Sequence, residues 1–411
     1  MTYIKLFLDN KRIISFGFLL TLFSSAGQTF FLSLYVNSIL ADFCLTNASF
    51  GLLYSSATIL SAAALAFAGR FIDYYNLRTY ALISSGLLCL SCVATALSRN
   101  IVVLFIGLWG LRFAGQGLLS HISSTSMAKF FIDKRGKALS VSVLGYAFGE
   151  GILPVIITGL ILLAGWRSSM MICAVIICGM LMPFIWFALN KKHLQYFPDN
   201  TDPGLEEPEF SPFALLRSKG FFLVSANVSI LPCVITGLFV YQQALAAEKA
   251  WPIGWLAACF IGYALCRAVF CVIGGRLVDR FSAVTLLPLF LIPFAFALLV
   301  ITFFSHPIAA LVYLALSGVA IGMSNIVNTA FLAEVYGQRH VGSIRAILVT
   351  IIVIATAIGP LVFGFLLDKG VSFSAIAALS ALLVFWVAAS SYRYVPYFKS
   401  QGMRRKTSFT A

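Results

Sequence analysis

Residues 69–73 read Gly-Arg-Phe-Ile-Asp directly after a long apolar run, and a close copy, Gly-Arg-Leu-Val-Asp, stands 206 positions later at residues 275–279. Two further matches have the same offset: Gly136 corresponds to Gly342, and Pro154 corresponds to Pro360. Similarity at one fixed spacing indicates an internal repeat. The sequence therefore predicts two copies of one unit of about 200 residues.

The composition excludes a water-soluble protein. Of the 411 residues, 61% are hydrophobic and 10% are charged, whereas a soluble domain has about 25% charged residues. Apolar runs long enough to cross about 30 Å of hydrocarbon begin near Ile13, Ala48, Thr79, Ile101, Ala138, Ser168, Phe221, Gly254, Val284, Pro307, Ala346 and Val371. They are too long and too evenly apolar for barrel strands, so we predict an all-α membrane protein with twelve transmembrane helices, six in each copy.

The net charge of +14 reflects membrane topology rather than a nucleic-acid partner. Most basic loop residues lie on the side that holds both termini. The opposite side has only Arg99, Arg167, Lys249 and Lys369. This asymmetry follows the positive-inside rule, which places both termini in the cytoplasm. We expect a multi-pass protein of a bacterial inner (plasma) membrane, with no nucleic acid among its partners.

The one sizeable break lies between the two copies and is rich in proline and acidic residues. Such a segment cannot pack a core and is typical of a flexible linker. We predict an N-terminal six-helix lobe at 1–190, a cytoplasmic linker at 191–217, a C-terminal six-helix lobe at 218–395 and a basic tail at 396–411. The tail combines basic and aromatic residues, which indicates contact with membrane lipid.

The loop that contains the first pentapeptide carries a more specific pattern. Gly69, Asp73 and Arg78 follow the form G-x-x-x-D-x-x-x-x-[RK], and in this the chain resembles the major facilitator superfamily over nearly its whole length. The resemblance implies two pseudo-symmetric six-helix bundles that rock to move a small molecule by alternating access. It also implies a monomer. The sequence has no nucleotide loop, metal cluster or nucleophile arrangement, so we expect neither an enzyme nor a cofactor.

The second copy keeps part of this pattern, namely Gly275, Asp279 and Arg280, but has no basic residue five positions after the aspartate. The resemblance implies that both loops form a gating latch between the lobes, which would be weaker in the second copy. The glycines are expected to let two helix ends approach closely. The alternative is that these charged loops only obey the positive-inside rule.

Three charged residues fall deep inside apolar runs. Arg112, Glu150 and Arg267 each lie about twelve residues from one end of a predicted span, so all three are near mid-depth. A charge at the bilayer centre costs several kcal/mol, and such residues mark candidate functional sites. Two arginines against one carboxylate predict a positively charged cavity, which favours a small anionic solute.

Polar residues accompany these charges. Gln116 lies four positions after Arg112, on the same helical face. The resemblance assigns to the cavity the helices that carry Gln28, Gln242, Asn325 and Asn328. We expect these residues, with Arg112 and Arg267, to bind the substrate. Two structural alternatives stay open: Arg112 bonds only backbone carbonyls of a neighbouring helix, or Arg267 and Glu150 form a permanent ion pair.

Glu150 is the candidate for proton coupling, because a carboxyl group whose partners change between two states can bind and release a proton. Uptake by symport with a proton is the preferred prediction. The alternatives are proton-driven export of a small organic compound or metal-chelating metabolite, and a non-transporting receptor or scaffold. Glu334 is expected to pair with loop arginines, and His121 to be a hydrogen-bonded packing residue.

Overall fold

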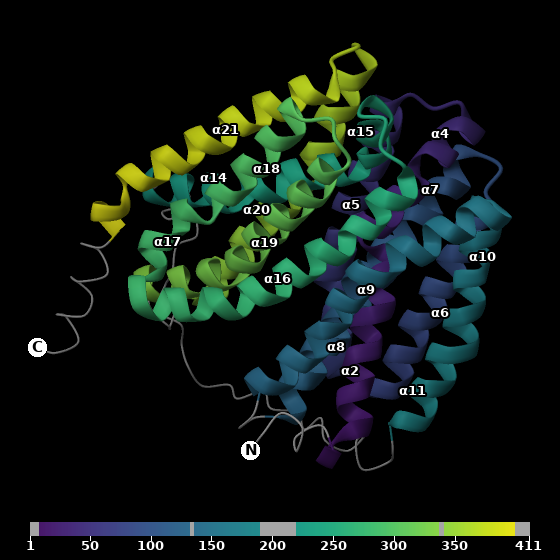
Figure 1. Ribbon diagram of the computed structural model, residues 1–411. Coiled ribbons are helices and arrows are strands. Elements are labelled where there is room, and N and C mark those ends of the chain that lie inside the picture. The colour runs from purple at the N-terminus through teal and green to yellow at the C-terminus, as the bar shows by residue number, and fades with distance from the viewer. Residues whose placement is uncertain (1–7, 132–134, 190–218, 337–340, 399–411) are drawn as a thin grey trace, which may run out of the picture. The chain divides into compact units, whose positions relative to one another are not determined.

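The computed structural model describes residues 8–131, 135–189, 219–336 and 341–398. The predicted linker and most of the predicted tail lie outside these ranges. The chain forms two compact units, Met1–Pro203 and Gly204–Ala411, which we call the N-lobe and the C-lobe and describe one at a time. Every element found in the described residues is a helix, which confirms the all-α prediction (Figure 1).

The N-lobe contains the helices that Figure 1 draws from purple to teal. In chain order they are α2 (Lys11–Ser24), η1 (Ser25–Gly27), α3 (Thr29–Leu32), η2 (Ser33–Tyr35), α4 (Val36–Phe43), α5 (Asn47–Ala68), η3 (Gly69–Asp73), α6 (Leu77–Ala96), α7 (Ile101–Gly110), η4 (Leu111–Leu119), α8 (Ser120–Phe130), α9 (Arg135–Ala164), α10 (Trp166–Ile176), η5 (Ile177–Leu181) and α11 (Met182–Ala188). Several helices begin at side-chain caps; Asn76 and Asn100, for example, accept the N–H groups of Arg78 and Val103 at 2.9 Å.

The C-lobe contains the helices drawn from teal through green to yellow, beginning with α14. In chain order they are α14 (Lys219–Val240), α15 (Gln242–Glu248), α16 (Ile253–Phe281), α17 (Ala283–Leu289), α18 (Leu291–Phe303), α19 (Ile308–Tyr336), α20 (Val341–Asp368) and α21 (Phe373–Arg393).

The described residues hold eleven helices that are long and apolar enough to cross a membrane, and a twelfth span if a bent pair is counted as one. The bent pair is Lys11–Gly27 with Thr29–Phe43, and its two halves meet at 46°. The twelve predicted spans are therefore present, and the first of them is broken in the middle.

The helix pairing repeats in the two lobes. In the N-lobe α2 packs along α9, α6 along α10, and α5 against α7 and η4. In the C-lobe α14 packs along α20, α18 along α21, and α16 along α19. In each lobe the first span thus pairs with the fifth, the second with the fourth, and the third with the sixth. The internal repeat seen in the sequence is a repeat of structure.

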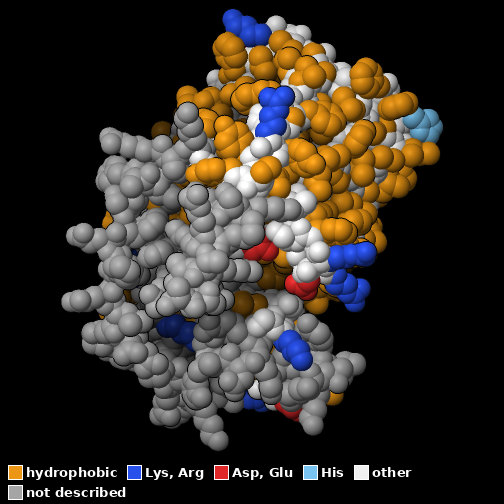
Figure 2. All heavy atoms as spheres, turned by 90° about the vertical axis from the view of Figure 1, so that its left-hand side faces the viewer, with side chains coloured by type: hydrophobic (Ala, Val, Ile, Leu, Met, Phe, Trp, Pro, Cys, Tyr) orange, Lys and Arg blue, Asp and Glu red, His pale blue; other side chains and the backbone are white. Residues whose placement is uncertain are grey.

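The surface of the protein is apolar. Hydrophobic side chains cover most of the described surface in Figure 2, and charged side chains are few there. Large side chains such as Leu163 and Phe187 are 88% and 75% exposed. Apolar area of this extent would drive aggregation in water but suits a lipid surround. The protein is a multi-pass integral membrane protein.

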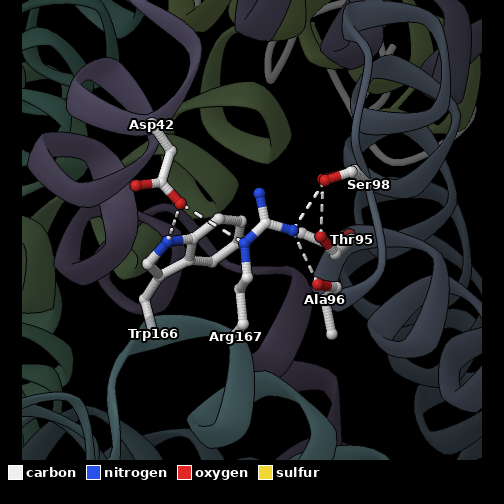
Figure 3. Close-up of polar contacts among 6 residues, drawn as sticks. All are labelled: Asp42, Thr95, Ala96, Ser98, Trp166 and Arg167. Atoms are coloured by element: carbon white, nitrogen blue, oxygen red, sulfur yellow. Dashed lines mark hydrogen bonds and ion pairs between the residues drawn. The ribbon is translucent and has the colours of Figure 1, made fainter.

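A cluster of polar contacts joins three spans at the end of the N-lobe that is predicted to face outside (Figure 3). The carboxylate of Asp42 accepts the indole N–H of Trp166 at 2.7 Å and Nε of Arg167 at 3.3 Å. Arg167 also donates to the carbonyls of Ala96 and Ser98, at 2.9 and 2.6 Å. The ends of the first and third spans are thereby tied to the start of the sixth.

The C-lobe has a carboxylate at the corresponding position, since Glu248 follows Asp42 by the same 206 residues. Glu248 accepts the backbone N–H of Phe373, and both the N–H and the hydroxyl of Ser374, the latter two at 2.9 and 2.6 Å. Burial raises the pKa of Glu248, but the bonds from Ser374 and Phe373 and the nearby Lys249 outweigh burial and lower it overall. The carboxylate therefore caps the N-terminus of α21 in its charged form.

We expect Glu248→Gln to lower the apparent unfolding temperature at neutral pH by about 2–4 °C, because it removes a charged cap. The lowered pKa means that this stabilisation is present above the ordinary glutamate value of about 4.3 and is lost as the pH falls through the lowered value. The difference between the variant and the wild type should therefore shrink in acid, as measured by thermal unfolding in detergent at several pH values. Asp279→Asn, at an exposed carboxylate of the same lobe, is the control; an equal effect there would contradict the capping role.

Candidate functional site

The break in the first span is the centre of the candidate site. Gln28 is in an extended conformation, with φ −82° and ψ 154°, between η1 and α3. The N–H of Phe31 bonds the carbonyl of Gln28, at 3.2 Å, so the carbonyl of Gly27 is left to other donors. Non-helical backbone at membrane depth is tolerated where it is buried in protein or lines a cavity, and in transporters it marks binding sites.

The fourth span packs against this break at two glycines. A Cβ atom at Gly27 would lie 2.6 Å from the backbone nitrogen of Gln116, and one at Gly115 would lie 2.8 Å from the backbone nitrogen of Gly27. Only glycine fits at both positions. The fourth span is a π-helix at this point, in η4, and π-helical segments occur frequently at functional sites.

Arg112 lies on η4 and is 1% exposed. Its Nη1 atom donates to the carbonyl of Gly27 at 3.2 Å and to the hydroxyl of Thr29 at 3.4 Å. The guanidinium lies 4.9 Å from the ring centroid of Tyr54, whose hydroxyl is 2.8 Å from that of Thr29. These partners are a carbonyl, a hydroxyl and a ring, none of which carries a full negative charge. The structural alternative for Arg112 named only backbone carbonyls as partners, and one of the two hydrogen bonds is of that kind. Its role in substrate binding stays a prediction.

Glu150 is 7% exposed and lies on α9. The preceding residue, Gly149, faces the same break from the fifth span: a Cβ atom there would clash with the hydroxyl of Ser25 and lie 3.2 Å from its Cβ. One broken helix thus contacts η4 through Gly27 and α9 through Ser25. The candidate anion-binding residue and the candidate proton carrier belong to two helices that pack on the same break.

The other two N-lobe candidates belong to the broken first span and to η4. Gln28 is the break residue itself and Gln116 is on η4; both are half-buried. Sequence reasoning did not connect Thr29 or Tyr54 with Arg112. A threonine and a tyrosine 25 positions apart give no signal of contact in a sequence, because only the packing of α5 against the broken span brings them together.

In the C-lobe, Arg267 lies on α16 and is half-buried. Gly318 and Gly322 of α19 approach this helix closely: a Cβ atom at Gly318 would lie 3.2 Å from the backbone nitrogen of Arg267, and one at Gly322 would lie 3.1 Å from that of Cys271. Two glycines four apart form a G-x-x-x-G packing motif, which sequence reasoning also missed. Arg267 is thereby held at a rigid helix crossing.

The remaining C-lobe candidates differ in their surroundings. Gln242 is buried at the start of α15, Asn328 is half-buried on α19, and Asn325 is exposed on α19. Their role in binding and the pairing of Arg267 with Glu150 both stay predictions.

The gating loops show one error in our expectations. Among the described residues, a Cβ atom at Gly69 would be 3.5 Å from its nearest neighbour, His121, and one at Gly275 would have no heavy atom within 4 Å. The prediction that these glycines permit a close helix approach is therefore wrong: neither is tightly packed. His121 instead bonds the carbonyl of Gly69 through Nε2, at 3.0 Å, as expected for a packing histidine.

The basic residue of the first loop is anchored inside its own lobe. Arg78 donates Nη2 to the carbonyl of Leu189 and lies 5.1 Å from the ring centroid of Trp186, so it ties the start of the third span to the end of the sixth. Asp279 and Arg280 are exposed near the end of α16. The side chain of Asp73 lies outside the described part of the protein, and its latch role stays a prediction.

The structure gives Glu334 a capping role that the sequence did not predict. Its carboxylate accepts the hydroxyl of Ser282 at 2.9 Å and the N–H groups of Ala283 and Val284 at 3.1 and 3.3 Å. Within the described residues it therefore caps α17 and no pair with a loop arginine is seen; Arg339 lies outside them. Ser282 has φ 72°, a left-handed conformation that side chains rarely adopt, and this bond helps to hold it.

Comparison with known proteins decides the family. The family model described as Major Facilitator Superfamily matches residues 17–252 and 247–408. The chain belongs to the Major Facilitator Superfamily. As a member, it is a membrane transporter of a small-molecule substrate and not an enzyme.

Individual relatives in this superfamily are distant. Monocarboxylate transporter 14 of Mus musculus is 27% identical over 142 residues, which are 33% of this chain and 27% of the mouse protein, so the match spans only about a quarter of that relative. The structure is similar to a bacterial homolog of the human lysosomal transporter Spinster (TM-score 0.70, 14% identity, 95% of this chain and 98% of that chain). It is also similar to the nucleoside transporter NupG (TM-score 0.70, 13% identity, 95% and 98%). At these identities the structural likeness shows the fold alone.

Proposed function

We propose that this transporter takes up a small anionic organic solute together with a proton. The proposal rests on the surroundings of Arg112. Its guanidinium is 1% exposed, lies in a membrane-spanning segment, and among the described residues contacts only groups that carry no full charge. A buried cation is costly unless an anion compensates it. A bound anionic solute would supply the missing charge, and we propose that Gln28 and Gln116 add polar groups to this site.

Glu150 supports the choice of the proton as coupling ion. It is a buried carboxyl on α9, which packs against the broken first span. The carbonyl of Gly27 in the same span accepts a hydrogen bond from Arg112. A rearrangement of this span on solute binding would change the surroundings of Glu150, and a carboxyl whose surroundings change can take up a proton in one state and release it in the other. In the C-lobe we propose that Arg267 adds positive charge and that Gln242, Asn325 and Asn328 contribute polar groups.

The name of the mouse relative, a monocarboxylate transporter, agrees with an anionic solute. For the membrane we propose a bacterial inner membrane with both termini in the cytoplasm, on the strength of the basic residues in the loops.

A ligand screen followed by a transport assay tests this function. Purified protein is screened by thermal shift against carboxylates, amino acids, sugars, nucleosides and chelators, because a ligand selective for the folded state raises the unfolding temperature. The best ligand is then offered to proteoliposomes with an acidic exterior. We expect an anion to score highest and to accumulate until a protonophore collapses the gradient. Binding of neutral solutes alone, or accumulation that ignores the protonophore, would contradict the proposal.

A further inference from the structure

Arg112 uses only part of its guanidinium in the contacts described above. Both of its hydrogen bonds, to Gly27 and to Thr29, come from Nη1. Nε is buried and has no hydrogen-bond partner within the described part of the chain. An arginine presents five N–H donors in a fixed planar fork, and the edge formed by Nε and Nη2 serves neither bond.

We propose that this edge binds a carboxylate side-on, and that Thr29 and Tyr54 are positioning residues that aim it. The inference rests on the proposed function, since it takes Arg112 as the residue that meets the solute, and it narrows the solute from an anion to a carboxylate. The two parallel N–H groups of a guanidinium edge match the two oxygens of a carboxylate in distance and in plane, which forms a bidentate pair.

Groups from three segments fix the orientation of the guanidinium and hence of its Nε–Nη2 edge. The carbonyl of Gly27 ends the first half of the broken span, and the hydroxyl of Thr29 begins the second half; both hold Nη1. The ring of Tyr54, on α5, lies against the guanidinium at 4.9 Å, and its hydroxyl fixes that of Thr29 at 2.8 Å. A guanidinium held in this way loses little freedom when a ligand binds, and such preorganisation raises affinity.

Specificity should follow from this geometry. A carboxylate is planar and uses both N–H groups. A sulfonate of similar size carries the same charge on a tetrahedral group, and an amide keeps the planar shape but lacks the charge. If the edge is aimed for a planar anion, a carboxylate should bind more tightly than either analogue.

The test uses the purified full-length protein and two sets of probes. Acetate, L-lactate, pyruvate, succinate and citrate represent carboxylates, and methanesulfonate and acetamide are the matched analogues of acetate. Affinities are measured by thermal shift and by quenching of tryptophan fluorescence, since Trp109 stacks on Phe113 beside Arg112. In the wild type we expect at least one carboxylate to bind, and acetate to bind more tightly than methanesulfonate and acetamide.

Two variants then test the positioning role. We expect Thr29→Val and Tyr54→Phe each to weaken carboxylate binding about three- to tenfold, the usual effect of one lost hydrogen bond, and to change methanesulfonate binding much less. Thr29→Ser should bind carboxylates about as tightly as the wild type does, because serine keeps the hydroxyl. The matched control is Tyr35→Phe, since Tyr35 is also fully buried and bonds a hydroxyl, that of Ser169 at 3.0 Å, away from Arg112. It should bind as the wild type does.

Each contrary outcome has a separate meaning. If methanesulfonate binds as tightly as acetate in the wild type, side-on carboxylate binding is overturned while anion transport stands. If no anion binds, the proposed function itself fails. Unchanged carboxylate affinity in Thr29→Val and Tyr54→Phe overturns the positioning role. If either variant fails to fold, the inference is still tested by the preference for acetate over methanesulfonate in the wild type and in Thr29→Ser. Loss of this preference in Thr29→Ser, which keeps the hydroxyl, would contradict the inference.

Discussion

Arg112→Ala is expected to abolish solute binding and to lower transport by at least about a hundredfold, because it removes the buried charge that the anion would neutralise. Arg112→Lys should keep part of the affinity, since a point charge remains, but should lose the preference for carboxylate over sulfonate, since the planar edge is gone. Binding and proteoliposome uptake of the best ligand from the screen measure both effects.

Arg112→Gln separates binding from folding. A glutamine amide can donate to the carbonyl of Gly27 or the hydroxyl of Thr29, which hold Nη1 in the wild type, but it carries no charge. We expect this variant to insert and fold yet to bind no anion. Arg167→Lys is the control, because Arg167 lies in the Asp42 cluster at one end of the N-lobe spans, whereas Arg112 is near mid-depth, and this change should affect stability alone. Wild-type affinity in Arg112→Ala or Arg112→Gln would show that Arg112 only supports the break.

Glu150→Gln is expected to abolish accumulation against a gradient and to leave exchange of solute across the membrane intact. Glutamine keeps the size and the hydrogen-bonding capacity of the side chain but cannot release a proton. Uphill uptake driven by a pH gradient measures the first effect, and counterflow between equal concentrations measures the second. Glu248→Gln makes the same chemical change at an exposed carboxylate outside the spans and should leave both assays unchanged.

Full accumulation by Glu150→Gln would exclude this residue as the proton carrier. The ion-pair alternative predicts another pattern, in which each single variant at Glu150 or Arg267 folds poorly because it leaves its partner buried and alone. A double variant with glutamine at both positions would then recover. Recovery of folding together with proton-driven transport would end the functional role of both residues.

The membrane fold could be predicted from the sequence because its signals are local or periodic. An apolar run such as the one that begins near Ile101 predicts a membrane span by its composition alone. The spacing between Asp73 and Asp279, which other residue pairs share, indicates the internal repeat. A charge within an apolar run is equally visible in the sequence, so Arg112, Glu150 and Arg267 could be identified as candidate functional residues from the sequence alone.

The contacts of these residues could not be predicted in the same way. Gly69 and Gly275 were expected where helix ends approach closely, whereas close approaches occur where Gly27 meets Gly115 and where Gly318 and Gly322 of α19 meet α16. Glu334 was expected to meet an arginine, and its capping of a helix was not predicted. A glycine or a carboxylate in a sequence indicates what a position permits, but its neighbours depend on how distant helices pack.

The sequence by itself thus determined that this protein lies in a lipid membrane, how many spans it has, that it contains an internal repeat, and which charged residues lie within the spans. These features could be predicted because hydrophobicity and charge are properties of each residue and of its near neighbours along the chain. Only the tertiary structure decided that the first span breaks at Gln28 and that Arg112 bonds the freed carbonyl of Gly27. It also decided that Thr29 and Tyr54 hold one side of the guanidinium. These contacts join three spans whose residues lie up to 85 positions apart, and their geometry arises only when the helices pack.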